Sequence, residues 1–128
     1  MLELLRQRVR QALSVETAAT LSTNGRGGIQ AGFFPCAADG LTLYFLVPSA
    51  SDLLFNLEMD TAVVVTTPRW QMEGDGQIHP LPFSSGSAAV RQLARSPHAA
   101  GCVLVAVPCQ RIHFSWENGW GYRETIDL

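Results

Sequence analysis

The stretch from Leu41 to Thr67, "LTLYFLVPSASDLLFNLEMDTAVVVTT", contains the pattern that decides the fold. Its apolar start, residues 41–47, predicts a buried strand, and the proline that follows ends it. Residues 49–51, called the serine turn below, lead into a predicted helix over residues 52–59. The β-branched run over residues 61–67 predicts another buried strand. The order is therefore strand, turn, short helix and strand.

The serine turn has the composition of an anion-binding helix start. Ser49 and Asp52 have the spacing of a capping box, with aspartate in place of glutamate. Two hydroxyls and the free N–H groups of a first helical turn suit a phosphate. The next residues are Asp52, Leu53 and Leu54, so no cation follows in the sequence. We therefore expect either that the turn holds no anion or that the charge partner of the anion comes from elsewhere.

The flanking segments predict more strands and two more helices. Gly74 and Gly76 indicate a bulge or a close backbone approach, and Asp39-Gly40 and Asn118-Gly119 are turn signals. About six antiparallel strands with three helices predict a mainly β protein, a small β-barrel, because a parallel sheet needs more crossover helices. The predicted helices cover residues 2–13 and 87–95, and the predicted strands cover residues 17–23, 29–37, 70–78 and 102–116, the last interrupted near Pro108.

The composition limits the function. The 128 residues suffice for one domain, residues 1–128, with 47% hydrophobic and 16% charged residues. A net charge of −2 argues against a nucleic-acid partner, and the absence of lysine excludes Schiff-base chemistry. No apolar run reaches membrane-spanning length and no signal region is present, so we expect no membrane partner and a cytoplasmic location.

The segment over residues 18–67, extended by Trp70 and Gly74, resembles the pyridoxamine 5′-phosphate oxidase-like, FMN-binding split-barrel superfamily. The resemblance implies a split β-barrel and a homodimer that binds FMN at the subunit interface. The motifs that carry it, in their order and spacing, are Ala19 to Thr23, Asp39-Gly40, Tyr44-Phe45, Ser49 to Ser51 and Asn56-Leu57.

The same resemblance implies where the FMN phosphate lies. It implies that the phosphate lies at Ser49 and Ser51 and is bound by a lysine and an arginine. In this sequence Leu53 occupies the position of the lysine and Asp52 that of the arginine. Val47 occupies the position at which the resemblance implies a threonine. The resemblance also implies a basic or hydroxyl residue on the second strand, where this sequence has Gln30, Ala31 and Gly32. Charge-assisted hydrogen bonds contribute roughly 1.5–3 kcal/mol each, so two lost partners weaken binding on the order of a hundredfold. An arginine of the partner subunit can compensate; the available ones are Arg26, Arg69 and Arg123.

Aromatic residues are the other candidates for a flavin site. Trp70, Trp116 and Trp120 can stack on an isoalloxazine ring, or pack in the dimer interface. Arg123 can contact the cofactor or the substrate, or pair with Glu117 or Glu124.

No metal site is predicted. His79, His98 and His113 match no metal-binding spacing, and a structural or solvated role is expected for each. The three cysteines, Cys36, Cys102 and Cys109, are expected to be small buried hydrophobes.

Three functions remain open at this point. The first is a flavin-dependent oxidoreductase or FMN-binding protein with an eroded phosphate site. The second is a non-catalytic dimeric split barrel that binds another small ligand or none. The third is a haem-binding split barrel. No catalytic residue, substrate or electron donor is predicted.

Overall fold

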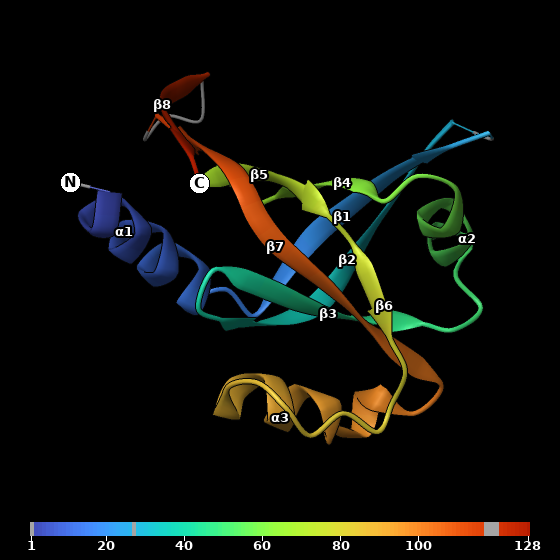
Figure 1. The fold of residues 1–128 in the computed structure, drawn as a ribbon. Coiled ribbons are helices and arrows are strands. Elements are labelled where there is room, and N and C mark those ends of the chain that lie inside the picture. Colours follow the sequence, from blue (N-terminus) through green and yellow to red (C-terminus); the bar gives the residue numbers. More distant parts are fainter. Residues whose placement is uncertain (1, 27, 117–120) are drawn as a thin grey trace.

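The computed structural model describes residues 2–26, 28–116 and 121–128. These form three α-helices, one short 3₁₀ helix and eight strands (Figure 1). The elements are α1 (Leu2–Ser14), β1 (Ala18–Gly25), β2 (Gly28–Asp39), β3 (Thr42–Pro48), α2 (Asp52–Met59), β4 (Ala62–Thr66), β5 (Trp70–Asp75), β6 (Gln77–His79), α3 (Ala88–Ala94), the 3₁₀ helix η1 (Pro97–Ala99), β7 (Cys102–Ser115) and β8 (Tyr122–Asp127).

Six antiparallel strands close into a barrel. The ring runs β1–β2–β3–β7–β5–β4 and returns to β1 through the β1–β4 pairing. The long strand β7 pairs with β3 and β6 through its first half and with β5 and β8 through its second half. The predicted small barrel with three helices is therefore confirmed, and β6 and β8 are additions outside the ring.

Two strand predictions need correction. The strand expected over residues 70–78 is interrupted at Gly76, whose N–H donates to the Thr61 carbonyl at 2.8 Å, and its two parts, β5 and β6, follow β7 in the same direction. The strand expected to break near Pro108 is continuous. Pro108 is tolerated because it faces Thr42, the first residue of β3, next to the register shift against β5. A Cβ on Gly74 would lie 2.4 Å from the Pro108 carbonyl oxygen, so the predicted close approach at this glycine is confirmed.

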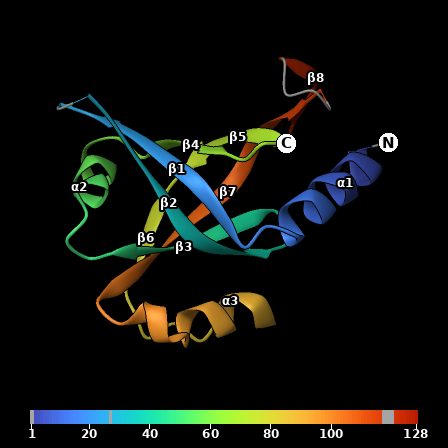
Figure 2. The ribbon, with the colours of Figure 1, turned by 180° about the vertical axis from the view of Figure 1, so that it is seen from behind.

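The helices cover different sides of the barrel. α1 and α2 lie at opposite ends, and α3 lies below it, across the barrel from β4 and β5 (Figures 1 and 2). Val9 and Leu13 of α1 are fully buried in the main core, whereas Leu2, at the start of the helix, is 51% exposed. Val90 of α3 belongs to a second cluster, with Leu46 and Leu104, on the outside of the barrel. None of the described helices has the length and apolar content that crossing a bilayer requires.

Candidate functional site

The serine turn is closed by its own hydrogen bonds. The N–H groups of Ser49 and Ser51 donate to the carbonyl oxygens of Gly101 and Pro48, both at 2.9 Å. Each of these two N–H groups is therefore already in use. An anion at this turn would have to displace internal hydrogen bonds or rely on the serine hydroxyls.

The helix α2 begins two residues later than the capping-box prediction requires. Ser51 has extended backbone angles, φ −70° and ψ 133°, and its hydroxyl accepts from the Leu53 N–H at 3.3 Å. The Leu54 N–H donates to the Ser51 carbonyl at 3.1 Å. The N-cap is thus Ser51, and the prediction of a capping box led by Ser49 is wrong because Ser49 and Ala50 form a turn outside the helix.

Two residues predicted at the phosphate have their side chains in the core. Val47 is fully buried and Leu53 is 2% exposed, both within the main hydrophobic cluster. Asp52, in contrast, is exposed. A lysine at position 53 would enter the core at the cost of burying a charge. Asp52 is therefore the position at which the charge of the turn can be altered without disturbing the barrel.

A buried polar link holds α2 against the β1–β2 hairpin. Asn56 Nδ2 donates to Thr23 Oγ1 at 3.2 Å, and this hydroxyl donates to the Gln30 carbonyl at 3.4 Å. Asn56 is 6% exposed and Thr23 is 2% exposed. The link connects α2 to the predicted residues of β2, of which Ala31 is exposed and Gln30 and Gly32 are half-buried. The predicted residues of β2 therefore lie beside α2.

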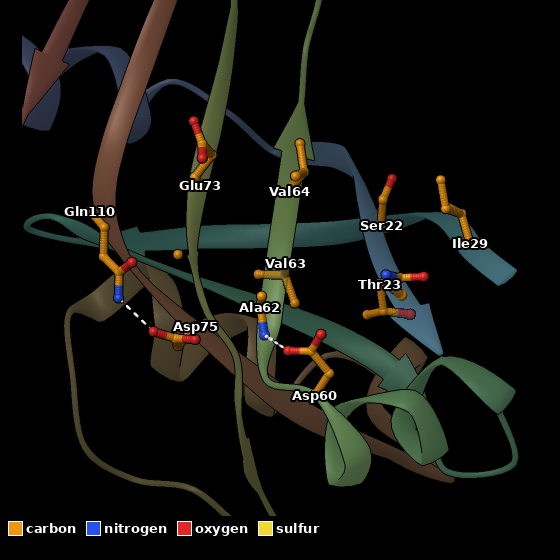
Figure 3. Close-up of a pocket in the computed structure, with 12 residues that line it drawn as sticks. Ser22, Thr23, Ile29, Asp60, Ala62, Val63, Val64, Glu73, Asp75 and Gln110 are labelled. Atoms are coloured by element: carbon orange, nitrogen blue, oxygen red, sulfur yellow. Dashed lines mark hydrogen bonds between the residues drawn. The ribbon is translucent and has the colours of Figure 1, made fainter. Parts of the chain in front are cut away.

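A cavity of about 400 Å³ lies on the sheet formed by β1, β4, β5 and β7 (Figure 3). Its carboxylates are Asp60, Glu73 and Asp75, and the described lining contains no arginine. Asp60 Oδ1 accepts from the Ala62 N–H at 3.0 Å, and Asp75 Oδ2 accepts from Gln110 Nε2 at 2.6 Å. A site of this charge suits the N–H groups of a ligand and disfavours a phosphate.

None of the site residues predicted from the sequence lines this cavity. The sequence does indicate which residues face outward here. Ala62 and Val64 alternate with the buried valines of β4, and Glu73 and Asp75 alternate with buried residues of β5. Cross-strand pairing then aligns Ser22, Val64 and Glu73 in one row on the outer face. The alignment depends on register, which no sequence pattern fixed.

A second cavity, called the tail cavity below, brings together three predicted residues. It measures about 360 Å³, and Trp70, Trp116 and Arg123 all line it. Trp70 is 1% exposed, and its Nε1 has no hydrogen-bond partner among the described residues. Trp116 is 54% exposed and therefore accessible for stacking. Trp120, the third predicted tryptophan, lies outside the described residues.

Ion pairs hold the walls of the tail cavity together. Arg69, which also lines it, pairs with Glu16 at 2.8 Å. Arg8 of α1 binds both carboxylate oxygens of Glu124 on β8, at 3.0 and 2.6 Å, and lies over the Phe114 ring with 5.5 Å to its centroid. The cavity therefore combines aromatic walls with two guanidinium groups, those of Arg69 and Arg123, a combination that suits a planar anionic ligand.

The predicted residues thus form two groups. The group around α2 and the group in the tail cavity, beside β8, lie on opposite sides of the molecule (Figures 1 and 2). One chain does not bring the two groups together.

The other titratable side chains have structural surroundings. Burial raises the pKa of the Cys36 and Cys109 thiols to about 12, so neither is a nucleophile at neutral pH. His113 contacts Glu73 through Nε2 at 2.6 Å and Thr125 through Nδ1 at 2.8 Å. Within residues 2–26, 28–116 and 121–128, no three histidine, cysteine or acidic side chains are grouped to hold a metal ion.

Comparison with known proteins identifies the fold. No family model matches this sequence, and no curated protein matches it. General Stress Protein 26 from Bacillus anthracis aligns with a TM-score of 0.68 at 16% identity, covering 97% of this chain and 98% of that one. A putative pyridoxamine 5′-phosphate oxidase from Listeria innocua aligns at 0.63 and 13% identity, covering 86% and 97%. An F420 reductase aligns at 0.55 and 16% identity, covering 80% and 94%.

The chain therefore has the pyridoxamine 5′-phosphate oxidase-like split-barrel fold, as the sequence resemblance predicted. At these identities the likeness extends to the fold and gives no specific ligand or reaction.

Proposed function

We propose that this protein is a flavin-binding split barrel that acts as a homodimer, with each FMN site built from two chains. The observation that supports this best is the separation of the two groups of predicted residues. A two-fold axis can bring the α2 end of one copy to the tail cavity of the other, because a symmetric dimer buries the same surface on both subunits.

The residues present fit the ring of FMN better than its phosphate. In the tail cavity, Trp116 offers an exposed ring for stacking, and Arg69 and Arg123 offer charge. At the serine turn, internal hydrogen bonds occupy the N–H groups of Ser49 and Ser51, and Asp52 adds a like charge. FMN, when bound, supplies oxidation–reduction chemistry, and the chain binds and orients the ring. We expect binding through the ring, with a weak contribution from the phosphate.

A complementation experiment tests the shared site. Ser49→Glu places a repulsive charge at the exposed turn, and Arg123→Glu does so in the tail cavity. Each homodimer is expected to lose FMN binding, measured by flavin fluorescence quenching. Co-expression of the two variants at equal levels gives half heterodimers, each with one intact site, so about a quarter of the wild-type binding should return. Absence of any recovery, with wild-type protein binding FMN, would show that the site does not span two chains.

The closed serine turn favours a second candidate, a non-catalytic split barrel whose ligand carries no phosphate at this turn. Calorimetry with FMN and riboflavin separates the two. Under the proposed function, Asp52→Arg strengthens FMN binding relative to riboflavin, because it replaces repulsion by attraction at a helix start, and the gain shrinks with salt. Asp52→Asn is the matched control and should give part of the gain. Equal affinities for both flavins in all three proteins would favour the second candidate.

A further inference from the structure

The helix α3 carries a cationic face that the proposed flavin site does not use. Arg91 lies in the last turn of α3 and Arg95, four residues later, is its C-cap, so both side chains lie on one side at the C-terminal end of the helix. With Ser84 and Gln92 they line a hollow of about 620 Å³. Arg91, Gln92, Arg95 and Ser84 are all exposed.

The surroundings of this face contain few negative charges, and Glu16, which lines a neighbouring hollow with Gln92 and Leu93, is already paired with Arg69. Residues 76–116 contain no aspartate and no glutamate, although the whole chain has 11 acidic and 9 basic residues. Within the described part of the chain, neither Arg91 nor Arg95 forms an ion pair, whereas Arg8, Arg10, Arg69 and Arg111 each do. A carboxylate oxygen of Asp39 lies 3.5 Å from where a Cβ on Gly86 would be, before the start of the helix.

The helix itself does not require both arginines. One cation in the last turn is favourable because it opposes the negative end of the helix dipole. A second one on the same face repels the first, and like charges at this spacing destabilise a helix. An anion that binds both would remove this cost.

We propose that the α3 face binds the diphosphate group of a small organic molecule. Side chains one turn apart stand about 5–6 Å from each other at their Cβ atoms, which allows each guanidinium to take one phosphoryl group. Guanidinium groups bind phosphate oxygens through two parallel hydrogen bonds. The Ser84 hydroxyl and the Gln92 amide add uncharged donors to the same hollow. The face lies across the barrel from the acidic cavity on β4 and β5, so the two sites can be occupied independently (Figure 1).

The test is a titration of the full chain with inorganic pyrophosphate at low ionic strength, followed by NMR of backbone amides and arginine Nε–H groups. We expect saturable shifts confined to α3 and the loop around Ser84, with pyrophosphate binding tighter than inorganic phosphate. Arg91→Gln and Arg95→Gln should each weaken pyrophosphate binding about fivefold. This corresponds to the roughly 1 kcal/mol that one exposed charge pair contributes. Because both side chains are exposed, thermal melts of the variants should match the wild type.

Arg10→Gln is the matched control, since Arg10 already pairs with Glu3 at 3.0 Å. It should leave pyrophosphate binding unchanged. Sodium chloride of equal ionic strength serves to exclude a general salt effect. Adenosine diphosphate distinguishes an organic ligand from free pyrophosphate, and tighter binding of the former supports the proposal. The proposal is overturned if pyrophosphate produces no saturable shift in the wild type or binds no tighter than phosphate. It is also overturned if the Arg91→Gln/Arg95→Gln double variant binds pyrophosphate as the wild type does, or if adenosine diphosphate does not bind.

Discussion

The contact between Gly25 and Asn56 gives a quantitative test of how α2 is held. A Cβ on Gly25 would lie 2.0 Å from Asn56 Oδ1 and 2.5 Å from its Cγ, distances at which something must move. Gly25→Ala should therefore destabilise the protein by about 1–3 kcal/mol, the usual cost of overpacking. Asn56→Ala removes the buried hydrogen bond to Thr23, and should cost about 1–2 kcal/mol.

The double variant separates these two causes. In the Asn56→Ala background the added methyl group meets no carboxamide, so the cost of Gly25→Ala should nearly vanish. The double variant is then expected to be more stable than the sum of the single changes predicts, by about 1–3 kcal/mol, the overpacking cost that disappears. Urea unfolding measures this, at one fixed protein concentration, because the stability of an oligomer depends on concentration.

Additive effects would refute this reasoning. Changes at separate sites usually add to within about 0.5 kcal/mol, so a coupling below that value would mean that the two side chains do not compete for one space. Gly28→Ala is a useful comparison, because a Cβ there meets nothing within 4 Å but the residue has φ of +96°. Its cost should be conformational, and Asn56→Ala should not relieve it.

Three further predictions concern the serine turn, the thiols and the tail. Ser51→Ala should lower the free energy of unfolding by about 1 kcal/mol, and Ser49→Ala should change it little, because only Ser51 caps α2; urea unfolding of both variants checks this. Iodoacetamide at pH 8 should leave Cys36 and Cys109 unmodified in the folded protein, as read by peptide mass mapping, because burial raises both pKa values to about 12. For the same reason the unfolding free energy should fall as pH rises above roughly 8.5, the thiol pKa of an unfolded chain, and continue to fall until about 12. The hydrogen bond from Arg8 lowers the pKa of Glu124. The stabilisation that this hydrogen bond gives the folded protein is therefore present near neutral pH and is lost as the pH falls through the lowered pKa. Glu124→Gln should therefore flatten the acid side of the stability profile measured by thermal melts, and addition of about 1 M NaCl should reduce the difference.

The order of elements could be predicted from the sequence because each element carries a local signal. Pro48 before the serine turn, the valine run over residues 61–67 and Pro68 after it indicate strand, helix and strand in that order. The orientation of Leu53 could not be predicted in the same way, since it depends on which face of an eight-residue helix meets the barrel. The resemblance assigned this position to a phosphate contact, and the structure places its side chain in the core.

The candidate site was less predictable than the fold for a related reason. Trp70 lies far from Trp116 and Arg123 in the sequence, and the pairing of β5, β7 and β8 brings the three residues to one cavity. The acidic cavity likewise depends on the register of β1, β4 and β5. A sequence pattern specifies which side of a strand is buried, but not which exposed side chains of different strands become neighbours.

The strand β7 has a consequence for the order in which the chain can fold. It supplies pairing partners to four other strands, and two of them, β3 and β5, belong to the ring. During synthesis, β3 and β5 leave the ribosome well before residues 102–115, and each then presents an unpaired edge. Exposed edges of apolar strands are sites of aggregation, and pairings between distant segments slow folding. We therefore expect the nascent chain to expose two unpaired sheet edges until β7 is made, and the barrel to close in a late step that joins both edges.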